Sequence, residues 1–534
     1  MDSKRTTARD SKRTTASFAA IAVIFHFAFS VFHSASAATA LVTIEPAATA
    51  LVTIAPGAEL GAVKLMNSVN GGPIVSPVRG AQKRGNFEDW KALEIPMGRT
   101  HDCINGVSGG AHAVDIDVIF RDFDADENDP KNYDFVFTDH YLDNMVRAGT
   151  KPYFRRGESI EHGPKKYGVL PPKDFAKWAR VCEHVIRHYN EGWGWATDKS
   201  YTTKNIAWSN QFNIVYWEIW NEPDLDPVDD PAKLPMGPRC WGGTVTNFFE
   251  FYTIAAKHLK SKFPALKIGG PAICGRFDWG RRFLEYCRDH EAPLDFFSWH
   301  IYATDPGRIA GRCREARKML DETGHKNAES ILNEWNYVKG WVDDWVYSLE
   351  VERGRFNQKA AAFIAGTMID CQYAPLDHLM FYDARPVGMN SLFEYSSGWP
   401  MKGYYPFYAW KRLLDYGTTV KCSVVEGRGK KSNAATGVVW DDGTPKAGKE
   451  GFRAVAAKDK TGKLAVLIAR YNEDNNVTDT ATVTFKAPAE AIGARPRAYL
   501  TDAIRSYTEM PLRKAADGAW KLQMQPNAFA FVEF

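Results

Sequence analysis

The sequence lacks any closely spaced pair of cysteines. Its eight cysteines, among 534 residues, are scattered without a C-x-x-C spacing. No zinc framework emerges from this pattern, and we predict neither a metal nor another cofactor. Cys182 and Cys371 lie inside predicted helices or strands. We therefore expect most of the cysteines to be buried free thiols, although export would permit disulfides.

A large excess of charge of one sign is also missing. The formal net charge is +3, and residues 1–37 account for all of it with five Lys and Arg residues against two Asp. The rest of the chain is therefore close to neutral. This argues against nucleic acid or an anionic membrane surface as a partner.

Long apolar runs are absent beyond the N-terminus, so no other segment approaches the length of a membrane span. Residues 18–32 are apolar except for His26 and Ser30; basic residues precede them, and the small residues 34–37 follow. This order is typical of an export signal. We predict a signal peptide at residues 1–37 and a secreted or periplasmic protein, with an uncleaved anchor as the alternative.

Two tandem duplications follow one another near the N-terminus. Residues 2–9 recur as 10–17, and residues 38–46 recur as 48–56. Two copies are too few for a solenoid. We interpret residues 38–60 as a low-complexity linker, with one copy as a possible strand of the β domain.

From residue 61 to 416, short apolar strands alternate with amphipathic helices. This alternation is typical of a parallel α/β fold, and eight such units predict a (β/α)8 TIM barrel. Helices are expected at 172–190, 246–262 and 358–373. The expected strands are 62–69, 93–101, 151–155, 214–220, 266–270, 294–300, 330–333 and 378–382.

Residues 417–534 differ from the barrel region in their pattern. Alternating strands are separated by Gly, Asn and Asp turns, with almost no helical periodicity. The pattern predicts an additional C-terminal all-β sandwich domain. We expect this domain to brace the barrel, and a separate carbohydrate-binding module is the alternative.

Two glutamates stand at the ends of apolar strands. Glu222 follows the strand within 214–225 and precedes Pro223, and Glu334 ends the strand within 330–337. Ligands bind at the carboxyl ends of barrel strands, and a pair of carboxyl groups is the simplest machinery for glycoside hydrolysis. We predict Glu222 as the acid/base and Glu334 as the nucleophile. Glu218, inside its strand, is expected to be a buried, paired carboxylate.

Several motifs resemble clan A of the glycoside hydrolases, and within it family 39, which includes β-xylosidases and α-L-iduronidases. The resemblance spans about residues 61–406. The stretches that carry it are 69–73 (VNGGP), 99–102 (RTHD), 217–223 (WEIWNEP), 298–302 (SWHIY) and 333–336 (NEWN).

The resemblance implies further roles at the site. Asn221 matches the clan residue that binds the sugar 2-hydroxyl, and Tyr302 is expected to orient Glu334. Further substrate-binding candidates are His300, His101, Asp102, Trp335 and Tyr382.

Two departures from the family pattern bear on the sugar. Asn333 stands where Thr is usual, and Arg155-Arg156 replaces an apolar run. The basic pair would suit a uronic acid if it faced the cleft, and a solvated pair is the alternative.

The sequence therefore predicts a retaining exo-acting glycoside hydrolase, β-xylosidase-like, that cleaves terminal sugars from oligosaccharides derived from plant or host polysaccharides. An endo-acting clan A glycanase and a non-catalytic carbohydrate-binding protein on the same barrel are the alternatives. Residues 106–110 match the G-x-S-x-G of serine esterases, but the expected strand at 113–120 follows them where a helix is required. The oligomeric state stays open.

Overall fold

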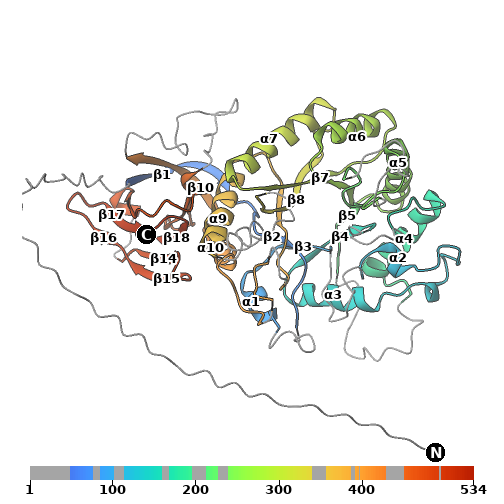
Figure 1. Ribbon diagram of the computed structural model, residues 1–534, viewed down its shortest axis with the longest axis horizontal. Helices are drawn as coiled ribbons and strands as arrows, with labels where there is room; N and C mark the ends of the chain where they lie inside the picture. Colours follow the sequence, from blue (N-terminus) through green and yellow to red (C-terminus); the bar gives the residue numbers. More distant parts are fainter. Residues whose placement is uncertain are drawn as a thin grey trace, which may run out of the picture. The chain divides into compact units, whose positions relative to one another are not determined.

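Within the described residues, eight parallel strands close into a barrel, each paired with the next along the chain and the last with the first (Figure 1). This computed structural model describes residues 49–75, 85–101, 113–158, 168–194, 212–225, 238–339, 357–386, 391–395, 397–427, 450–491 and 495–534. The barrel strands are β2 (Ser68–Asn70), β3 (Met97–Arg99), β4 (Lys151–Arg156), β5 (Tyr216–Ile219), β6 (Lys267–Ile273), β7 (Phe296–Ala303), β8 (Glu329–Tyr337) and β9 (His378–Phe381). The predicted barrel is confirmed.

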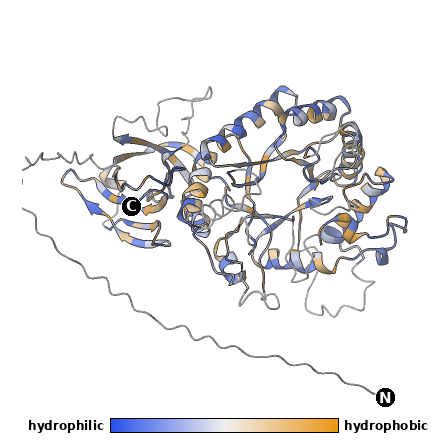
Figure 2. Cartoon of the chain, in the orientation of Figure 1, coloured by the Kyte–Doolittle hydropathy of each residue, from blue (hydrophilic) through white to orange (hydrophobic). Residues whose placement is uncertain are grey.

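Helices surround the barrel, and Figure 2 shows hydrophilic and hydrophobic residues alternating along them. In α4, Asp174 accepts a hydrogen bond from the N–H of Lys177 at the start, and Gly192 ends the helix with a φ of 80°. The helices are α1 (Phe87–Ala92), α2 (Ile116–Ile119), α3 (Val136–Arg147), α4 (Phe175–Glu191), α5 (Val245–Lys262), α6 (Phe277–Asp289), α7 (Pro306–Glu322), α9 (Gln358–Gln372) and α10 (Tyr404–Tyr416).

The expected strand at 113–120 is wrong. Residues Ile116–Ile119 form the single helical turn α2, which follows Asp115 in an extended conformation. Ile116 and Ile119 are buried on one side of this turn. A short apolar run does not distinguish a strand from a buried helical turn by periodicity alone. The G-x-S-x-G residues 106–110 lie outside the described residues.

A second sheet of ten strands forms the C-terminal β domain, as predicted. Its strands follow the order β15-β14-β18-β12-β11-β10-β1-β13-β17-β16. Among these, β1 and β13 run parallel, and the other neighbouring pairs run antiparallel. The strands are β1 (Thr49–Ala62), β10 (Thr418–Gly427), β11 (Gly451–Lys458), β12 (Leu464–Tyr471), β13 (Ala481–Lys486), β14 (Arg497–Thr501), β15 (Thr508–Pro511), β16 (Arg513–Lys514), β17 (Trp520–Met524) and β18 (Ala528–Glu533).

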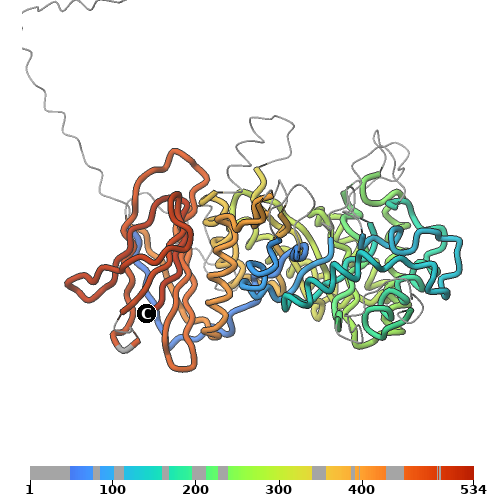
Figure 3. The backbone as a smooth tube through the Cα atoms, turned by 90° about the horizontal axis from the view of Figure 1, so that it is seen from below, coloured from blue at the N-terminus to red at the C-terminus, as the bar shows by residue number. Residues whose placement is uncertain are grey.

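The ten strands fold over a core of their own. The rings of Phe485, on β13, and Phe534, just after β18, lie 5.8 Å apart, although four strands separate β13 from β18 in the sheet. Figure 3 shows β1, in blue, among the orange and red strands of this sheet. Residues 49–60, expected as linker with one possible strand, thus form most of β1.

The β domain packs against α9 and α10 of the barrel. Asp370 of α9 and Arg453 of β11 form a buried ion pair at 2.8 Å, and Arg412 of α10 pairs with Glu533 of β18 at 2.6 Å. These contacts join the barrel to the β domain through charged groups as well as apolar surface.

The amino-terminal part of the barrel interior is apolar. Its buried residues pack into one cluster, and they are Met97, Tyr153, Phe296, Ile331 and Met380. The seven cysteines within the described residues are free thiols, and Cys182 and Cys371 are buried, in agreement with the prediction. In the part of the chain that the structure describes, no helix combines the length and apolar character that a membrane span requires.

Candidate active site

Glu222 lies in a tight turn immediately after β5. Both Trp220 and Glu222 have a positive φ, of 76° and 47°. Residues other than glycine keep this left-handed conformation only where their surroundings hold them in it. The N–H of Glu222 donates to the carbonyl oxygen of Ala272 at 2.9 Å, and the Trp220 indole donates to that of Cys240 at 2.7 Å. These contacts fix Glu222, which is 5% exposed.

Glu334 lies on β8 directly after a β-bulge. Along the ladder with β7, Trp299 pairs with Leu332 and His300 pairs with Glu334, so Asn333 is an extra residue. A bulge re-aims the side chains that follow it. As a result, the side chains of Asn333 and Glu334 both reach groups inside the barrel, although they are consecutive on one strand.

Four side chains surround the Glu334 carboxylate, and they are Arg99, His101, His300 and Tyr302. Its Oε1 accepts from Nη1 of Arg99 at 2.7 Å and lies 3.3 Å from Nε2 of His101, and its Oε2 accepts from the Tyr302 hydroxyl at 2.8 Å. Burial raises the pKa of Glu334, but the charges of His300, His101 and Arg99 and the Tyr302 hydrogen bond outweigh it and lower the pKa to about 2. Glu334 is therefore ionised at neutral pH.

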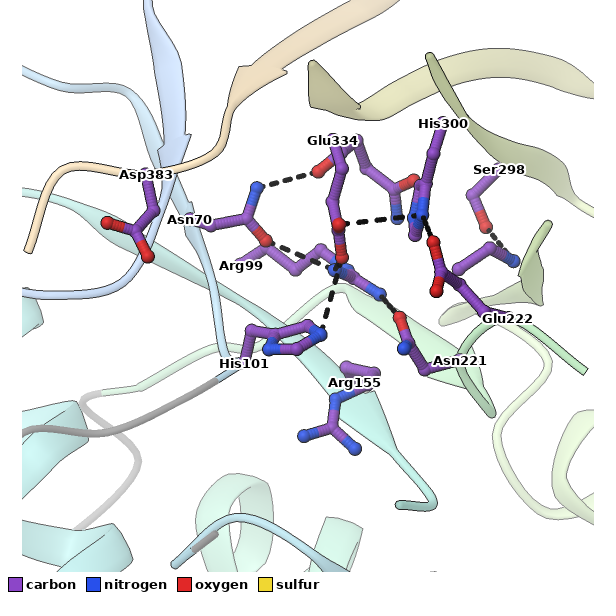
Figure 4. A network of polar contacts seen from close by, with 12 residues as sticks. Asn70, Arg99, His101, Arg155, Asn221, Glu222, Ser298, His300, Glu334 and Asp383 are labelled. Carbon is purple, nitrogen blue, oxygen red and sulfur yellow. Dashed lines mark hydrogen bonds and ion pairs between the residues drawn. The ribbon is translucent and has the colours of Figure 1, made fainter. Parts of the chain in front are cut away.

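The two glutamates meet at His300. Nδ1 of His300 lies 2.7 Å from Oε1 of Glu222 and 3.5 Å from Oε2 of Glu334 (Figure 4). A carboxylate oxygen from each glutamate and a ring nitrogen of His300 all lie within 4.8 Å of one another. Two carboxyl groups 112 positions apart in the sequence thus share one small space at the carboxyl ends of the strands.

Arg99 connects the pair to the rest of the site. Its Nη1 donates to Oδ1 of Asn70 at 3.1 Å as well as to Glu334, and its Nη2 donates to Oδ1 of Asn221 at 2.8 Å. Its Nε donates to Glu218 at 2.7 Å. The Nδ2 of Asn221 has no partner among the described residues, which leaves this buried donor available to a bound hydroxyl.

Most of the other predicted sugar contacts lie beside this pair. The rings of His101 and Tyr382 pack edge to face with centroids 5.4 Å apart, and those of Tyr302 and Tyr382 lie 6.4 Å apart. The side chains of His101, Tyr302 and Tyr382 therefore lie together with His300 beside Glu334. Asp102 lies outside the described residues.

Trp335 requires a correction. It is fully buried, and its ring packs against Phe381 and Phe363, with centroids 5.3 and 6.2 Å away. Because side chains alternate along β8 after the bulge, Trp335 faces α9 while Glu334 faces the barrel interior. The Trp335 ring therefore belongs to the packing between β8, β9 and α9.

The basic pair at the end of β4 is neither exposed to solvent nor directed to a single side of the strand. Arg155 and Arg156 are both fully buried. Arg155 pairs with Asp115 at 2.6 Å, whereas Arg156 lies over the Trp217 ring, 5.4 Å from its centroid. Since successive residues of a strand face opposite sides, the two arginines do not form a joint site for a uronic acid.

Within the described residues, two groups of side chains could each offer three metal ligands. One is Glu222, His300 and Glu334, and the other is Asp115, Asp117 and Glu158. In the first group, Arg99 and Tyr302 donate hydrogen bonds to Glu334 and His300 contacts Glu222, which favours a hydrogen-bonded site. In the second, burial and the neighbouring charges of Asp115 and Asp117 raise the pKa of Glu158 well above its ordinary value, which disfavours the ionised form that a metal ligand needs.

The sequence analysis gave no role to Arg99 or Asn70. Both end barrel strands, at the carboxyl side where ligands bind. Their position at a strand end was the one feature of the sequence that could have indicated a role at the site. It did not indicate that Arg99 would contact Glu218, Glu334 and Asn221 together.

A closed barrel that brings two carboxyl groups together at the carboxyl ends of its strands is an arrangement that glycoside hydrolases use, and the family match below makes this the class of the protein. The family model for the glycosyl hydrolases family 39 matches residues 86–376, more than half of the chain. The chain belongs to this family.

Curated relatives and solved structures are consistent with this membership. The chain is 27% identical over 275 residues to a β-xylosidase of Caldicellulosiruptor saccharolyticus, covering 49% of this chain and 50% of the relative. It is 28% identical over 195 residues to a β-xylosidase of Geobacillus stearothermophilus, covering 35% and 34%. The alignments thus span half or less of these relatives. A glucosidase structure from Croceicoccus marinus shares the fold with a TM-score of 0.64 at 20% identity, covering 91% of this chain and 98% of that one.

Proposed function

We propose that this chain is a retaining exo-glycoside hydrolase, β-xylosidase-like, that removes terminal sugars from oligosaccharides of plant or host origin by double displacement. The observation that carries the proposal is the approach of carboxylate oxygens of Glu222 and Glu334 to within 4.8 Å. Retaining enzymes hold their carboxyl groups about 5–5.5 Å apart, and inverting enzymes about 6.5–9.5 Å. With one oxygen of each carboxyl group within 4.8 Å of the other, the pair lies nearer to the retaining than to the inverting arrangement, which favours direct attack by a carboxylate.

In the first step, an oxygen of Glu334 attacks the anomeric carbon and forms an ester bond. The bond from that carbon to the leaving oxygen breaks, and its electron pair stays on the leaving oxygen, which takes a proton from Glu222. The ionised state of Glu334 and its contacts to Arg99 and Tyr302 support its role as the nucleophile.

In the second step, a water molecule attacks the anomeric carbon and gives a proton to the Glu222 carboxylate. The ester bond breaks, and its electron pair returns to Glu334. Two inversions give net retention. Nδ2 of Asn221 would donate to the sugar 2-hydroxyl during both steps, a contact that strengthens in the transition state.

The identity of the sugar rests on the relatives. Two curated relatives carry the name β-xylosidase, which supports xylose as the terminal residue. The buried Arg155–Asp115 pair is a reason to disfavour a uronic acid, because the positive charge of Arg155 is already neutralised.

A panel of aryl glycosides tests the proposal, comprising the β-xyloside, β-galactoside, β-glucoside, α-arabinoside and α-iduronide. We expect the β-xyloside to be hydrolysed fastest and proton NMR to detect the β-anomer of xylose first. Glu334→Ala should abolish nearly all turnover. First release of the α-anomer from the β-xyloside would refute the assignment of Glu334 as nucleophile.

Xylooligosaccharides separate the alternatives. An exo-acting enzyme releases xylose from the first turnovers, whereas an endo-acting glycanase of clan A releases mixed shorter oligosaccharides. A non-catalytic carbohydrate-binding protein would bind the oligosaccharide without any turnover. The presence of both glutamates supports catalysis.

Export is a further part of the proposal. Residues 1–37 combine basic residues, an apolar run and a small-residue site, which supports removal of this segment during secretion. N-terminal sequencing of the exported protein should begin near Ala38, and retention of Met1 would count against cleavage.

A further inference from the structure

Glu218 is a fully buried carboxylate to which the proposed mechanism gives no role. It lies on β5, four residues before Glu222. Its Oε1 accepts from the Tyr153 hydroxyl at 2.9 Å and from Nδ2 of Asn333 at 2.5 Å, and its Oε2 accepts from Nε of Arg99 at 2.7 Å. A buried charge is tolerated when it is paired and hydrogen-bonded, as this one is. The fixed partners lead from Glu218 to Glu334 by two routes.

The first route runs through Arg99. The guanidinium group is planar and rigid, so fixing one of its edges fixes the direction of its other donors. Glu218 holds the Nε atom, while Nη1 donates to Glu334 at 2.7 Å and Nη2 donates to Asn221 at 2.8 Å. The position of Glu218 therefore sets the direction of two hydrogen bonds at the site.

The second route runs through the bulge in β8. Asn333 is the extra residue that turns Glu334 inward, and its side chain donates to Glu218. Its carbonyl oxygen accepts from Nδ2 of Asn70 at 2.6 Å. Glu218 thus binds the side chain of Asn333 in the bulge, and Asn70 binds the backbone of the same residue. A relaxed bulge would change where Glu334 lies relative to the barrel.

We propose that Glu218 is a positioning residue for Glu334, which it fixes through Arg99 on one side and through the Asn333 bulge on the other. The inference rests on the proposed function, because it takes Glu334 as the nucleophile.

The proposal predicts an effect on one step of the reaction. Loss of Glu218 misplaces the Glu334 carboxylate relative to the anomeric carbon, which slows formation of the ester. In the second step Glu334 is already bonded to the sugar and leaves as a carboxylate, so hydrolysis of the ester depends less on Glu218. With an activated aryl glycoside, kcat/KM reports the first step and kcat can report the second.

The test compares Glu218→Gln with the wild-type protein on an activated aryl glycoside of the panel. We expect kcat/KM to fall roughly 10- to 100-fold, the range for a lost hydrogen bond to a charged group, with a smaller fall in kcat. Asp370→Asn is the matched control, since Asp370 is a buried carboxylate paired with an arginine outside the site. The control should keep the wild-type ratio of kcat/KM to kcat even where its stability is reduced.

A second variant covers the case in which Glu218→Gln does not fold. Asn333→Ala removes one donor to Glu218 without changing a charge. It should cause a smaller fall with the same preference for kcat/KM. Where Glu218→Gln does fold, the double variant should lose less than the sum of the two single losses in free energy. A parallel fall of kcat and kcat/KM in either variant, or a ratio like that of the control, would overturn the proposal.

A crystal structure of Glu218→Gln separates this inference from the proposed function. We expect the contact between Nη1 of Arg99 and Oε1 of Glu334 to lengthen from 2.7 Å beyond hydrogen-bond distance. This readout needs no substrate. If the wild-type protein hydrolyses no glycoside of the panel, the proposed function fails while the positioning of Glu334 is still measured. An unchanged Arg99–Glu334 contact refutes the positioning itself.

Discussion

Nδ1 of His300 lies 2.7 Å from Oε1 of Glu222 and 3.5 Å from Oε2 of Glu334, so one imidazole ring contacts both carboxyl groups. The ring is buried, with His300 1% exposed. Burial lowers the pKa of His300, but the charge of Glu334 and the hydrogen bond to Glu222 outweigh it and raise the pKa above its ordinary value. The ring therefore takes up a proton more readily than a free imidazole, and its positive charge stabilises the ionised Glu334 carboxylate beside it.

Replacing His300 by Ala should therefore impair catalysis more than stability. The substitution removes the contact of Nδ1 with Glu222 and the imidazole that favours the ionised form of Glu334, and we expect a roughly 10- to 100-fold fall in kcat/KM. Steady-state kinetics on the β-xyloside measures this change. The matched control is His258→Ala, because His258 contacts Glu183 at the same 2.7 Å outside the site. Equal kinetic losses in both variants would argue against a specific role for His300.

Glu222→Ala should respond to added azide. Without the acid/base, turnover is expected to persist mainly on aryl glycosides with good leaving groups, because these need no protonation. Azide, a small anion, can enter the space left by the carboxyl group and attack the glycosyl-enzyme. We expect azide to restore turnover and NMR to detect a β-glycosyl azide. Glu334→Ala, which cannot form the ester with its own side chain, should give no such β-product; its formation there would contradict the two assignments.

Glu334 should also make stability depend on pH. Its pKa falls from an ordinary 4.5 to about 2 in the folded protein. A lowered pKa contributes stability that is fully present above about pH 5 and is lost as the pH falls toward 2. The contribution is on the order of 3 kcal/mol. Urea unfolding of the wild-type protein and Glu334→Gln at pH 6, 4.5 and 3 should show the difference between them shifting in favour of the variant as the pH falls. Parallel pH dependences would contradict a lowered pKa.

The parts of the fold that repeat were predictable from the sequence. Each barrel strand is a short apolar run that ends near a polar residue, and Glu222 and Glu334 are the clearest of these. Strand ends meet on one side of a barrel, so their approach follows from the topology. The sequence could not indicate that Arg99 lies among four side chains, because this depends on the register between strands.

Two differences have a local physical cause. Strict alternation along β8 would place Asn333 and Glu334 on opposite sides, and the bulge at Asn333 is invisible in the apolar pattern. Trp335 was expected at the sugar from the family resemblance, yet it follows Glu334 on the strand and packs into the core. A strand prediction needs its register before it can assign a face to each residue.

The buried pair between Asp370 and Arg453 should matter for stability, because it joins α9 to the β domain. Asp370→Asn leaves a buried arginine without its counter-charge, which costs about 3–5 kcal/mol in such pairs. Urea unfolding should show a lower midpoint for this variant. The exposed pair of Arg281 and Glu322, 2.6 Å apart, provides the contrast, and Glu322→Gln should leave the midpoint close to that of the wild-type protein. If both substitutions lowered the midpoint equally, the burial of the Asp370–Arg453 pair would not explain its contribution to stability.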